Sequence, residues 1–240
     1  MNKGIYPALS GGVAYEKLLT IIANNVANIN TAGYKADRPV FRVDVPDTIS
    51  ATSSLLPVKD KFYTEIDSVF TDFNTGVIRQ TGNVLDLAIE GDGFFVIDTP
   101  EGPRYTRSGN FILDSSNAIT TVDGHMVMGE GGPIILEEGK VSVDTDGRVS
   151  VDGSEINKLR VVDFEKPYML QKDQNNMFSG SGEQTAEGYK VLQGAVELSN
   201  VNSVKEMAAM ISVLRGYESY QKVMTTMDET SAKANEVGRV

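Results

Sequence analysis

Both ends of this chain carry apolar residues at the three-four spacing of helices that pack on other helices. The N-terminal pattern consists of Tyr15, Leu18, Ile22 and Ile29, with the polar Asn25 at one of its positions. The C-terminal pattern consists of Met210, Val213, Tyr217, Tyr220, Met224 and Met227, and Met207, Ile211 and Leu214 widen its apolar face. The N-terminal pattern is only about half as long, so one such helix cannot cover the whole C-terminal face. We therefore expect neighbouring subunits to cover the remainder.

Local signals predict where these helices begin and end. Gly33 lies where a left-handed cap would end the N-terminal helix. Ser203 and Glu206 form a capping-box pattern at the start of the C-terminal helix. No proline follows, so we expect that helix to run from Val204 to about Asn235. The two ends are expected to pack together as a coiled-coil-like bundle.

Between the ends the pattern changes from helical to β. Asp-Gly pairs, which are typical of hairpin turns, separate short alternating runs at Asp92-Gly93, Asp123-Gly124, Asp146-Gly147 and Asp152-Gly153. The sequence therefore predicts an α+β protein with long terminal helices and a central antiparallel β-rich domain.

These patterns also predict the domain boundaries. We expect a terminal helical assembly domain formed by residues 1–35 and 203–240, an extended connecting arm at 36–75, a central β domain at 76–195 and a return connection at 196–202. Because residues 76–195 hold all of the Asp-Gly turns, we expect this span to fold on its own.

Composition restricts the kinds of partner and chemistry. The chain has no cysteine, which excludes disulfides and thiolate metal sites and suits an exported protein. The first residues lack the apolar core and cleavage site of a signal peptide, so we expect export without a cleaved one. The net charge of −11 comes from the middle of the chain, because the ends are close to neutral. An acidic middle disfavours nucleic acid and anionic lipid as partners, although solubility explains it equally well.

No pattern points to catalysis or to a bound metal. His125 is the only histidine and stands beside a turn without convergent groups. Asp144 and Asp146 begin a stretch similar to a calcium loop, but Arg148 occupies a ligand position and the glycine required at the sixth position is missing. Acidic residues are numerous, yet no spacing selects a glycosidase pair. We therefore expect no enzyme activity, cofactor, metal or small-molecule substrate.

Four stretches resemble motifs of the flagellar basal-body rod and hook proteins and occur in that family's order. Asn24–Lys35 resembles NNLANVNTxGFK, Thr81–Phe95 resembles TGNPLDLAIxGDGFF, Tyr105–Phe111 resembles YTRxGxF, and Glu197–Asn202 resembles LExSNV. Stretches near residues 4–11, 35–41 and 124–134 are most similar to the proximal rod members, and the distal rod members are a close alternative.

The resemblance implies a structural axial subunit of the proximal rod, in the periplasm-crossing part of the flagellar basal body. It implies export through the flagellar type III apparatus, and helical assembly through the terminal helices to transmit torque from motor to hook. The implied partners are further copies of the chain, homologous rod proteins including the distal rod protein, and the membrane ring. The expected subunit-interface residues are Leu18, Ile22, Asn25, Ile29, Met207, Met210, Val213, Leu214, Tyr217, Tyr220, Met224 and Met227. From its seam position, Asn25 is expected either to cap the helix end, which is the commoner role of such an asparagine, or to fix register as a polar seam residue.

Two alternatives remain open at this point. The first is the distal rod protein of the same family. The second, from another class, is a secreted β-rich adhesin or binding protein whose helical ends dimerise. A monomer in dilute solution would favour a rod subunit, and a stable coiled-coil dimer would favour the adhesin.

Overall fold

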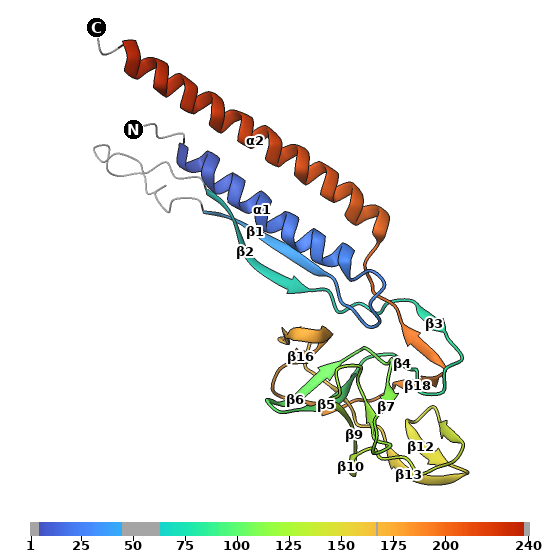
Figure 1. Ribbon diagram of the computed structural model, residues 1–240. Helices are drawn as coiled ribbons and strands as arrows, with labels where there is room; N and C mark the ends of the chain where they lie inside the picture. Colours follow the sequence, from blue (N-terminus) through green and yellow to red (C-terminus); the bar gives the residue numbers. More distant parts are fainter. Residues whose placement is uncertain (1–4, 45–62, 167, 238–240) are drawn as a thin grey trace. The chain divides into compact units, whose positions relative to one another are not determined.

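The computed structural model of the chain describes residues 5–44, 63–166 and 168–237 (Figure 1). It divides into two compact units, each built from separate stretches of sequence. The helical unit comprises Met1–Ala27, Asp37–Thr71 and Asn202–Val240, and the β unit comprises Asn28–Ala36 and Asp72–Val201. The predicted α+β class is confirmed.

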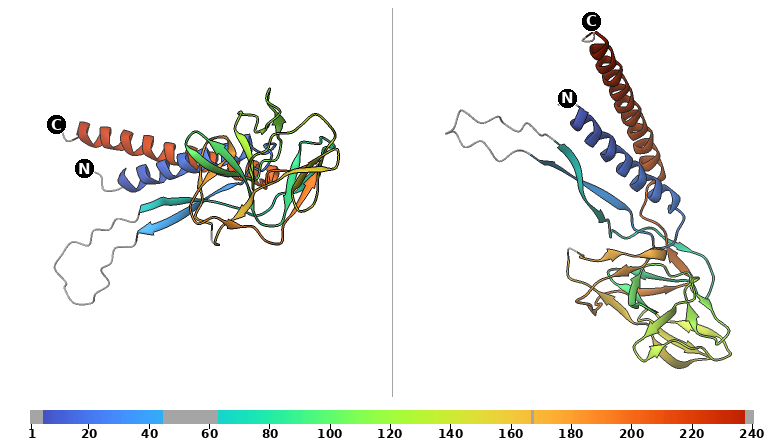
Figure 2. Two further views of the ribbon diagram at one scale, coloured as in Figure 1. Left: turned by 90° about the horizontal axis from the view of Figure 1, so that it is seen from below. Right: turned by 60° about the vertical axis from the view of Figure 1, so that its left-hand side comes forward.

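The helical unit contains both helices and one small sheet. Helix α1 (Ile5–Ala27) lies between helix α2 (Ser203–Val237) and the antiparallel strands β1 (Asp37–Asp44) and β2 (Tyr63–Thr71), as Figures 1 and 2 show. These strands fall within the stretch expected as an extended arm. A single pair of helices is not a bundle, so the bundle stays a prediction.

The helix boundaries correct two details of the sequence analysis. Helix α1 ends at Ala27, so the prediction that Gly33 ends it is wrong. Helix α2 begins at Ser203, close to the expected start, but its cap is Asn202. The Asn202 side-chain oxygen accepts the Lys205 backbone N–H at 3.0 Å, as an N-cap residue does. The predicted Ser203–Glu206 capping box therefore does not form, and the Glu206 carboxylate instead accepts from Arg38 at 3.1 Å.

The described strands of the β unit pair antiparallel, as predicted. The largest sheet contains β5 (Phe94–Thr99), β6 (Gly102–Thr106), β7 (Ile112–Leu113), β8 (Ile119–Thr120), β9 (Met126–Gly129), β10 (Gly132–Pro133), β14 (Val161–Asp163), β15 (Gln171–Lys172), β16 (Phe178–Ser179) and β17 (Gln184–Thr185). Smaller sheets join β11 (Val141–Val143), β12 (Arg148–Val151) and β13 (Ser154–Lys158), then β4 (Leu87–Glu90) with β18 (Lys190–Gln193), and β3 (Ile78–Gln80) with β19 (Ala195–Glu197). A short 3-10 helix spans Gln174–Asn176.

The Asp-Gly pairs behave as hairpin turns with one exception. Asp152 and Gly153 have φ values of 50° and 85° and connect the paired strands β12 and β13, as a type I′ turn does. The pairs at 123–124 and 146–147 also join paired strands. The pair at 92–93 separates β4 from β5, which pair with other strands.

Strand β5 separates the two cores of the β unit. Phe95 and Ile97 belong to a large aliphatic cluster with the buried valines of β11 and β12, whereas Phe94 and Val96 belong to an aromatic cluster with Tyr105. Because successive side chains of a strand point to opposite faces, an uninterrupted apolar run is what a strand buried on both sides requires.

Candidate assembly interface

The predicted three-four pattern of α2 marks the less exposed side of that helix. Glu206 and Val213 are buried, and Met210, Tyr217, Tyr220, Met224 and Met227 are partly buried. The less exposed side of α1 consists of Ala14, Ile21, Ile22 and Asn25, which are buried, and Leu18, which is partly buried. Most residues expected at subunit contacts therefore lie on the inner faces of one chain's own helical unit.

Two tyrosines fix how α1 and α2 pack. The rings of Tyr15 and Tyr220 contact each other with centroids 5.2 Å apart. Each ring also covers a glycine of the opposite helix. A Cβ atom at Gly216 would lie 2.5 Å from Cε1 of Tyr15, and one at Gly11 would lie 2.7 Å from Cε1 of Tyr220. The glycines thus provide the space in which the rings sit, and a larger residue at either position would require the opposing ring to move.

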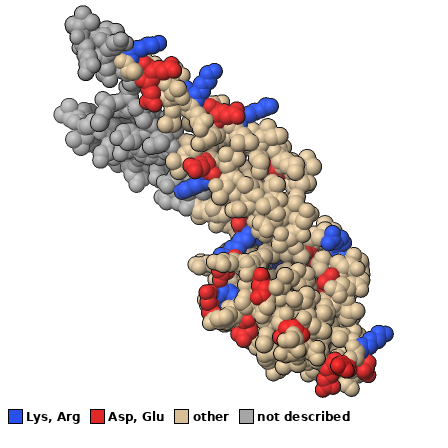
Figure 3. Space-filling view, in the orientation of Figure 1, with Lys and Arg blue, Asp and Glu red and all other residues tan. Residues whose placement is uncertain are grey.

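A second apolar face of α2 is exposed. Val204, Met207, Ile211 and Leu214 are 75%, 53%, 54% and 41% exposed, and their three-four-three spacing places them along one side of the helix. We call these residues the outer stripe. In the face shown in Figure 3, charged side chains gather over the C-terminal half of α2 and are sparse over the N-terminal half, where the stripe lies.

Polar contacts tie α1 and α2 to strand β1. The buried Asn25 side chain forms two hydrogen bonds with the backbone of Asp37: its amide nitrogen donates to the carbonyl at 3.0 Å, and its oxygen accepts the N–H at 3.0 Å. The Thr71 hydroxyl donates to the Asp37 carboxylate at 2.9 Å across the strand pair. Asn25 thus takes the place of a strand partner for β1, a role that the sequence pattern did not indicate.

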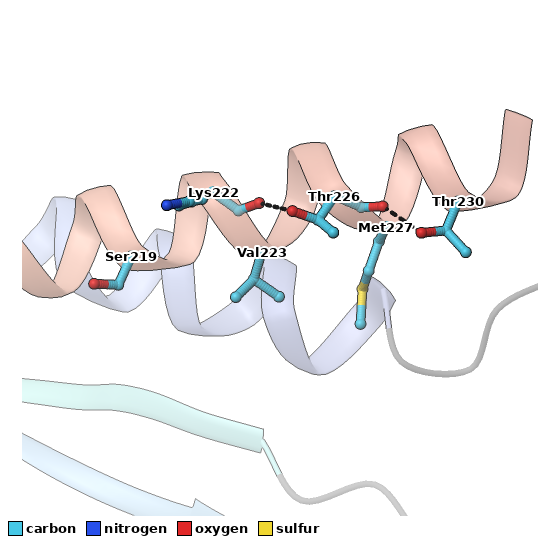
Figure 4. Close-up of a pocket in the computed structure, with 6 residues that line it drawn as sticks. All are labelled: Ser219, Lys222, Val223, Thr226, Met227 and Thr230. Carbon is cyan, nitrogen blue, oxygen red and sulfur yellow. Dashed lines mark hydrogen bonds between the residues drawn. The ribbon is translucent and has the colours of Figure 1, made fainter. Parts of the chain in front are cut away.

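A groove of about 490 Å³ runs along the C-terminal half of α2 (Figure 4). Val223 and Met227 project to the same side of the helix, and Thr226 and Thr230 flank them. Both threonine hydroxyls donate to the carbonyl four residues earlier, at 2.8 Å and 2.7 Å, so these donors are already used by the helix. A groove with apolar side chains and few free polar groups fits packing better than recognition of a polar small molecule.

The remaining expected interface residues divide between two other places. Met207 and Leu214 belong to the outer stripe. Ile29 follows the end of α1 and packs in the β unit against Tyr34, Ala36 and Val201. The sequence pattern does not identify Gly11 and Gly216 as packing residues. Both glycines are visible in the sequence as small residues within an apolar helical pattern. That pattern does not show that a tyrosine ring of the other helix lies against each of them.

The sequence motifs in the β unit meet at a buried charged group. The Glu197 carboxylate lies 2.6 Å from the Lys35 ammonium and 3.4 Å from the Arg107 guanidinium. Burial lowers the pKa of Lys35, and the neighbouring Glu197 carboxylate acts in the opposite direction. The group is closed to solvent, so it is structural in character.

Within the described part of the chain, acidic residues and histidine do not form a cluster that could hold a metal ion. Among the described helices, none is both long and apolar enough to cross a membrane.

Comparisons with known proteins connect these features to one family. Three family models match: "Flagella basal body rod protein" over residues 8–35, "Flagellar hook protein FlgE/F/G D1 domain" over 88–151, and "Flagellar basal body rod FlgEFG protein C-terminal" over 192–237. The first and last cover most of α1 and α2, and the second covers much of the β unit.

Full-length relatives give the same result. The chain is 35% identical to the flagellar basal-body rod protein FlgF of Rhizobium meliloti, over 98% of both chains. It is 33% identical to FlgG of Bacillus subtilis, over 95% of this chain and 96% of that protein. It is 32% identical to FlgF of Caulobacter vibrioides, over 98% of both. The chain therefore belongs to the flagellar basal-body rod protein family that includes FlgF and FlgG, and its role is structural.

Proposed function

We propose that this chain occupies the proximal part of the rod and assembles helically through the outer faces of its terminal helices. The observation that carries the proposal is the outer stripe, Val204, Met207, Ile211 and Leu214, which the chain's own α1 leaves exposed. Large apolar side chains aligned on one side of a helix are typical of an interaction surface. The rod family supplies the kind of partner, namely other rod subunits.

Burial of the stripe would contribute substantially to assembly. Each large apolar side chain contributes about 1.5–3 kcal/mol when fully buried, and these side chains are already partly buried. Four of them together therefore offer several kcal/mol per subunit contact, before the entropy cost of association. A shaft that transmits torque from motor to hook requires such contacts along its whole length.

The proposal extends to location and partners. The subunit would leave the cell interior through the flagellar type III apparatus without a cleaved signal peptide, and would lie in the periplasm-crossing part of the basal body. Its partners would be further copies of itself, homologous rod proteins including the distal rod protein, and the membrane ring. It would have no enzyme activity. The similarity to both FlgF and FlgG leaves the distal rod as the second candidate position.

A charge placed in the stripe tests the proposal. Leu214→Asp would require a carboxylate to be desolvated at the subunit contact, so we expect the variant to be missing from purified basal bodies and the cells to be non-motile. The matched control is Ser212→Asp, which places the same charge on another exposed side of α2. Circular dichroism should show both variants folded. Normal incorporation of Leu214→Asp would show that the stripe is not a subunit contact.

A further inference from the structure

The β unit encloses three charged side chains from distant parts of the sequence. The side chains of Lys35, Glu197 and Arg107 are 1%, 1% and 3% exposed. One oxygen of Glu197 accepts from Lys35 at 2.6 Å and from the Gly76 backbone N–H at 2.7 Å, and the other lies 3.4 Å from Arg107. Two cations thus share one carboxylate with almost no access to water.

The remaining hydrogen bonds of the two cations go to backbone carbonyls. Lys35 donates to Asn74 at 2.9 Å, while Arg107 donates to Gly91 at 2.7 Å and to Ile89 at 3.3 Å. All four sequence motifs are therefore represented in this group, which we call the charged cluster. Since a buried charge without its partner is strongly destabilising, each member depends on the presence of the others.

The segment that carries Lys35, residues 28–36, is bound to the β unit along much of its length. The Gly33 N–H donates to the Glu197 carbonyl at 2.8 Å, and the Asn176 side chain donates to the Ala32 carbonyl at 2.9 Å. The Lys172 ammonium lies 3.9 Å from the centre of the Tyr34 ring and donates to the Lys35 carbonyl at 2.8 Å.

Gly33 allows the closest approach. Its φ is +66°, and a Cβ atom there would lie 2.3 Å from the backbone carbon of Arg107. Only glycine fits this combination of left-handed backbone and contact with another backbone. The segment thus docks directly on the strand end that supplies Arg107.

The same segment binds parts of the β unit that are far apart in the sequence. Residues 37–71 belong to the helical unit, and the residues on either side of them are joined in the β unit, where the Asp72 N–H donates to the Ala36 carbonyl at 2.8 Å. The Asn200 side chain accepts the Ala36 N–H at 2.8 Å and donates to the Asp72 carbonyl at 2.7 Å. Early and late parts of the sequence are thus joined at one place.

We infer that residues 28–36 are the closing segment of the β unit, and that this unit reaches its stable fold only when the closing segment and residues 197–201 have both docked. Without the closing segment Glu197 lacks its nearest cation, and without residues 197–201 Arg107 is buried without a charged partner. Folding of the β unit is therefore coupled to an N-terminal segment that lies outside the span 76–195. The inference does not depend on the proposed assembly through the outer stripe.

Native-state hydrogen exchange on the full-length chain tests the inference. If the closing segment is integral to the β unit, the amides of Gly33 and Asp72 should open with the same free energy as those of Phe95–Ile97 in the core strand. If the amides of the closing segment exchange about 100-fold faster than the core, the segment undocks independently and the inference is overturned.

A pair of matched variants provides the second readout. Lys35→Met leaves the carboxylate of Glu197 without its nearest cation, so protection of Phe95–Ile97 should fall by roughly 100-fold or more, together with that of Asp72. The control, Lys166→Met, removes an ion pair of the same 2.6 Å length to Asp92, but these side chains are 57% and 54% exposed. Its protection should remain within about threefold of the wild type. Failure of Lys35→Met alone to fold would also support the inference, whereas equal effects of the two variants would refute it.

Discussion

Alanine substitution of three glycines separates packing from helix propensity in the helical unit. Gly11 and Gly216 lie beneath the rings of Tyr220 and Tyr15, whereas a Cβ atom at Gly12 would have no atom within 4 Å. Gly11 and Gly12 are neighbours in one helix, so Gly12→Ala is a close control for Gly11→Ala. The two substitutions change the chain identically and differ only in what the new methyl group meets.

The structure sets the expected magnitudes. Alanine in place of glycine within a helix stabilises it by about 1 kcal/mol, so Gly12→Ala should raise the free energy of unfolding by about that amount. At Gly11 and Gly216 the new methyl would lie 2.7 Å and 2.5 Å from ring carbons. The rings must then move by about 1 Å, and overpacking of this kind costs about 1–3 kcal/mol. Gly11→Ala and Gly216→Ala should therefore be about 1–3 kcal/mol less stable than Gly12→Ala.

Urea unfolding followed by far-UV circular dichroism measures these differences, and hydrogen exchange at Ile22 and Val213 assigns them to the helical unit. In a Tyr15→Leu background, Gly216→Ala should lose most of its cost, because the clashing ring is gone. Equal stabilisation by Gly11→Ala and Gly12→Ala would refute the proposed fit of rings over glycines.

Three further substitutions test individual contacts. Asn25→Ala should cost about 2 kcal/mol in urea unfolding, because the partly buried backbone of Asp37 loses two hydrogen bonds, whereas Ala at the exposed Lys17 of the same helix should cost less than about 0.5 kcal/mol. Asn202→Ala should cost about 1 kcal/mol through loss of the helix cap, and Ser203→Ala should cost clearly less. A larger loss of stability from Ser203→Ala than from Asn202→Ala would instead support the predicted capping box. Burial, together with a carboxylate hydrogen bond, raises the pKa of Tyr105 to about 12. Its contribution to stability is thus present below about pH 10 and lost as the pH rises towards 12, by at most about 3 kcal/mol. Tyr105→Phe should flatten this alkaline loss in a pH series of melting curves, and an unchanged slope would contradict the assignment.

The elements that the sequence predicted well are those with a strong local pattern. The three-four spacing from Met207 to Met227 gave a helix that the structure places at Ser203–Val237. The valines at 141, 143, 149 and 151 alternate around an Asp-Gly turn and pair across it, Val141 with Val151 and Val143 with Val149. Periodicity and turn residues suffice in these cases because the determining interactions are close in sequence.

The features that were missed depend on contacts distant in sequence. Gly33 has the expected left-handed backbone, but the reason is the backbone of Arg107 rather than a helix end. Asn25 has the spacing of a seam residue, yet its amide binds the backbone of Asp37. Glu197 showed no sign of burial in the local pattern, because its cations come from positions 35 and 107. The independent folding of residues 76–195 that the sequence predicts is untested, and the charged cluster leads to the opposite expectation, that a stable fragment must also contain residues 28–36 and 197–201.

The central claim is that this chain is a rod subunit, and its position in the intact basal body tests that claim most directly. A small tag inserted at the exposed turn Asp152–Gly153 should leave the cores of the β unit unchanged, since a side chain at Gly153 would meet no atom within 4 Å. Electron cryomicroscopy of labelled basal bodies from the bacterium that encodes the chain should then show the tag on the rod, on the motor side of the distal rod. Absence of the tag from purified basal bodies, in cells that still secrete the tagged chain and swim, would contradict the account.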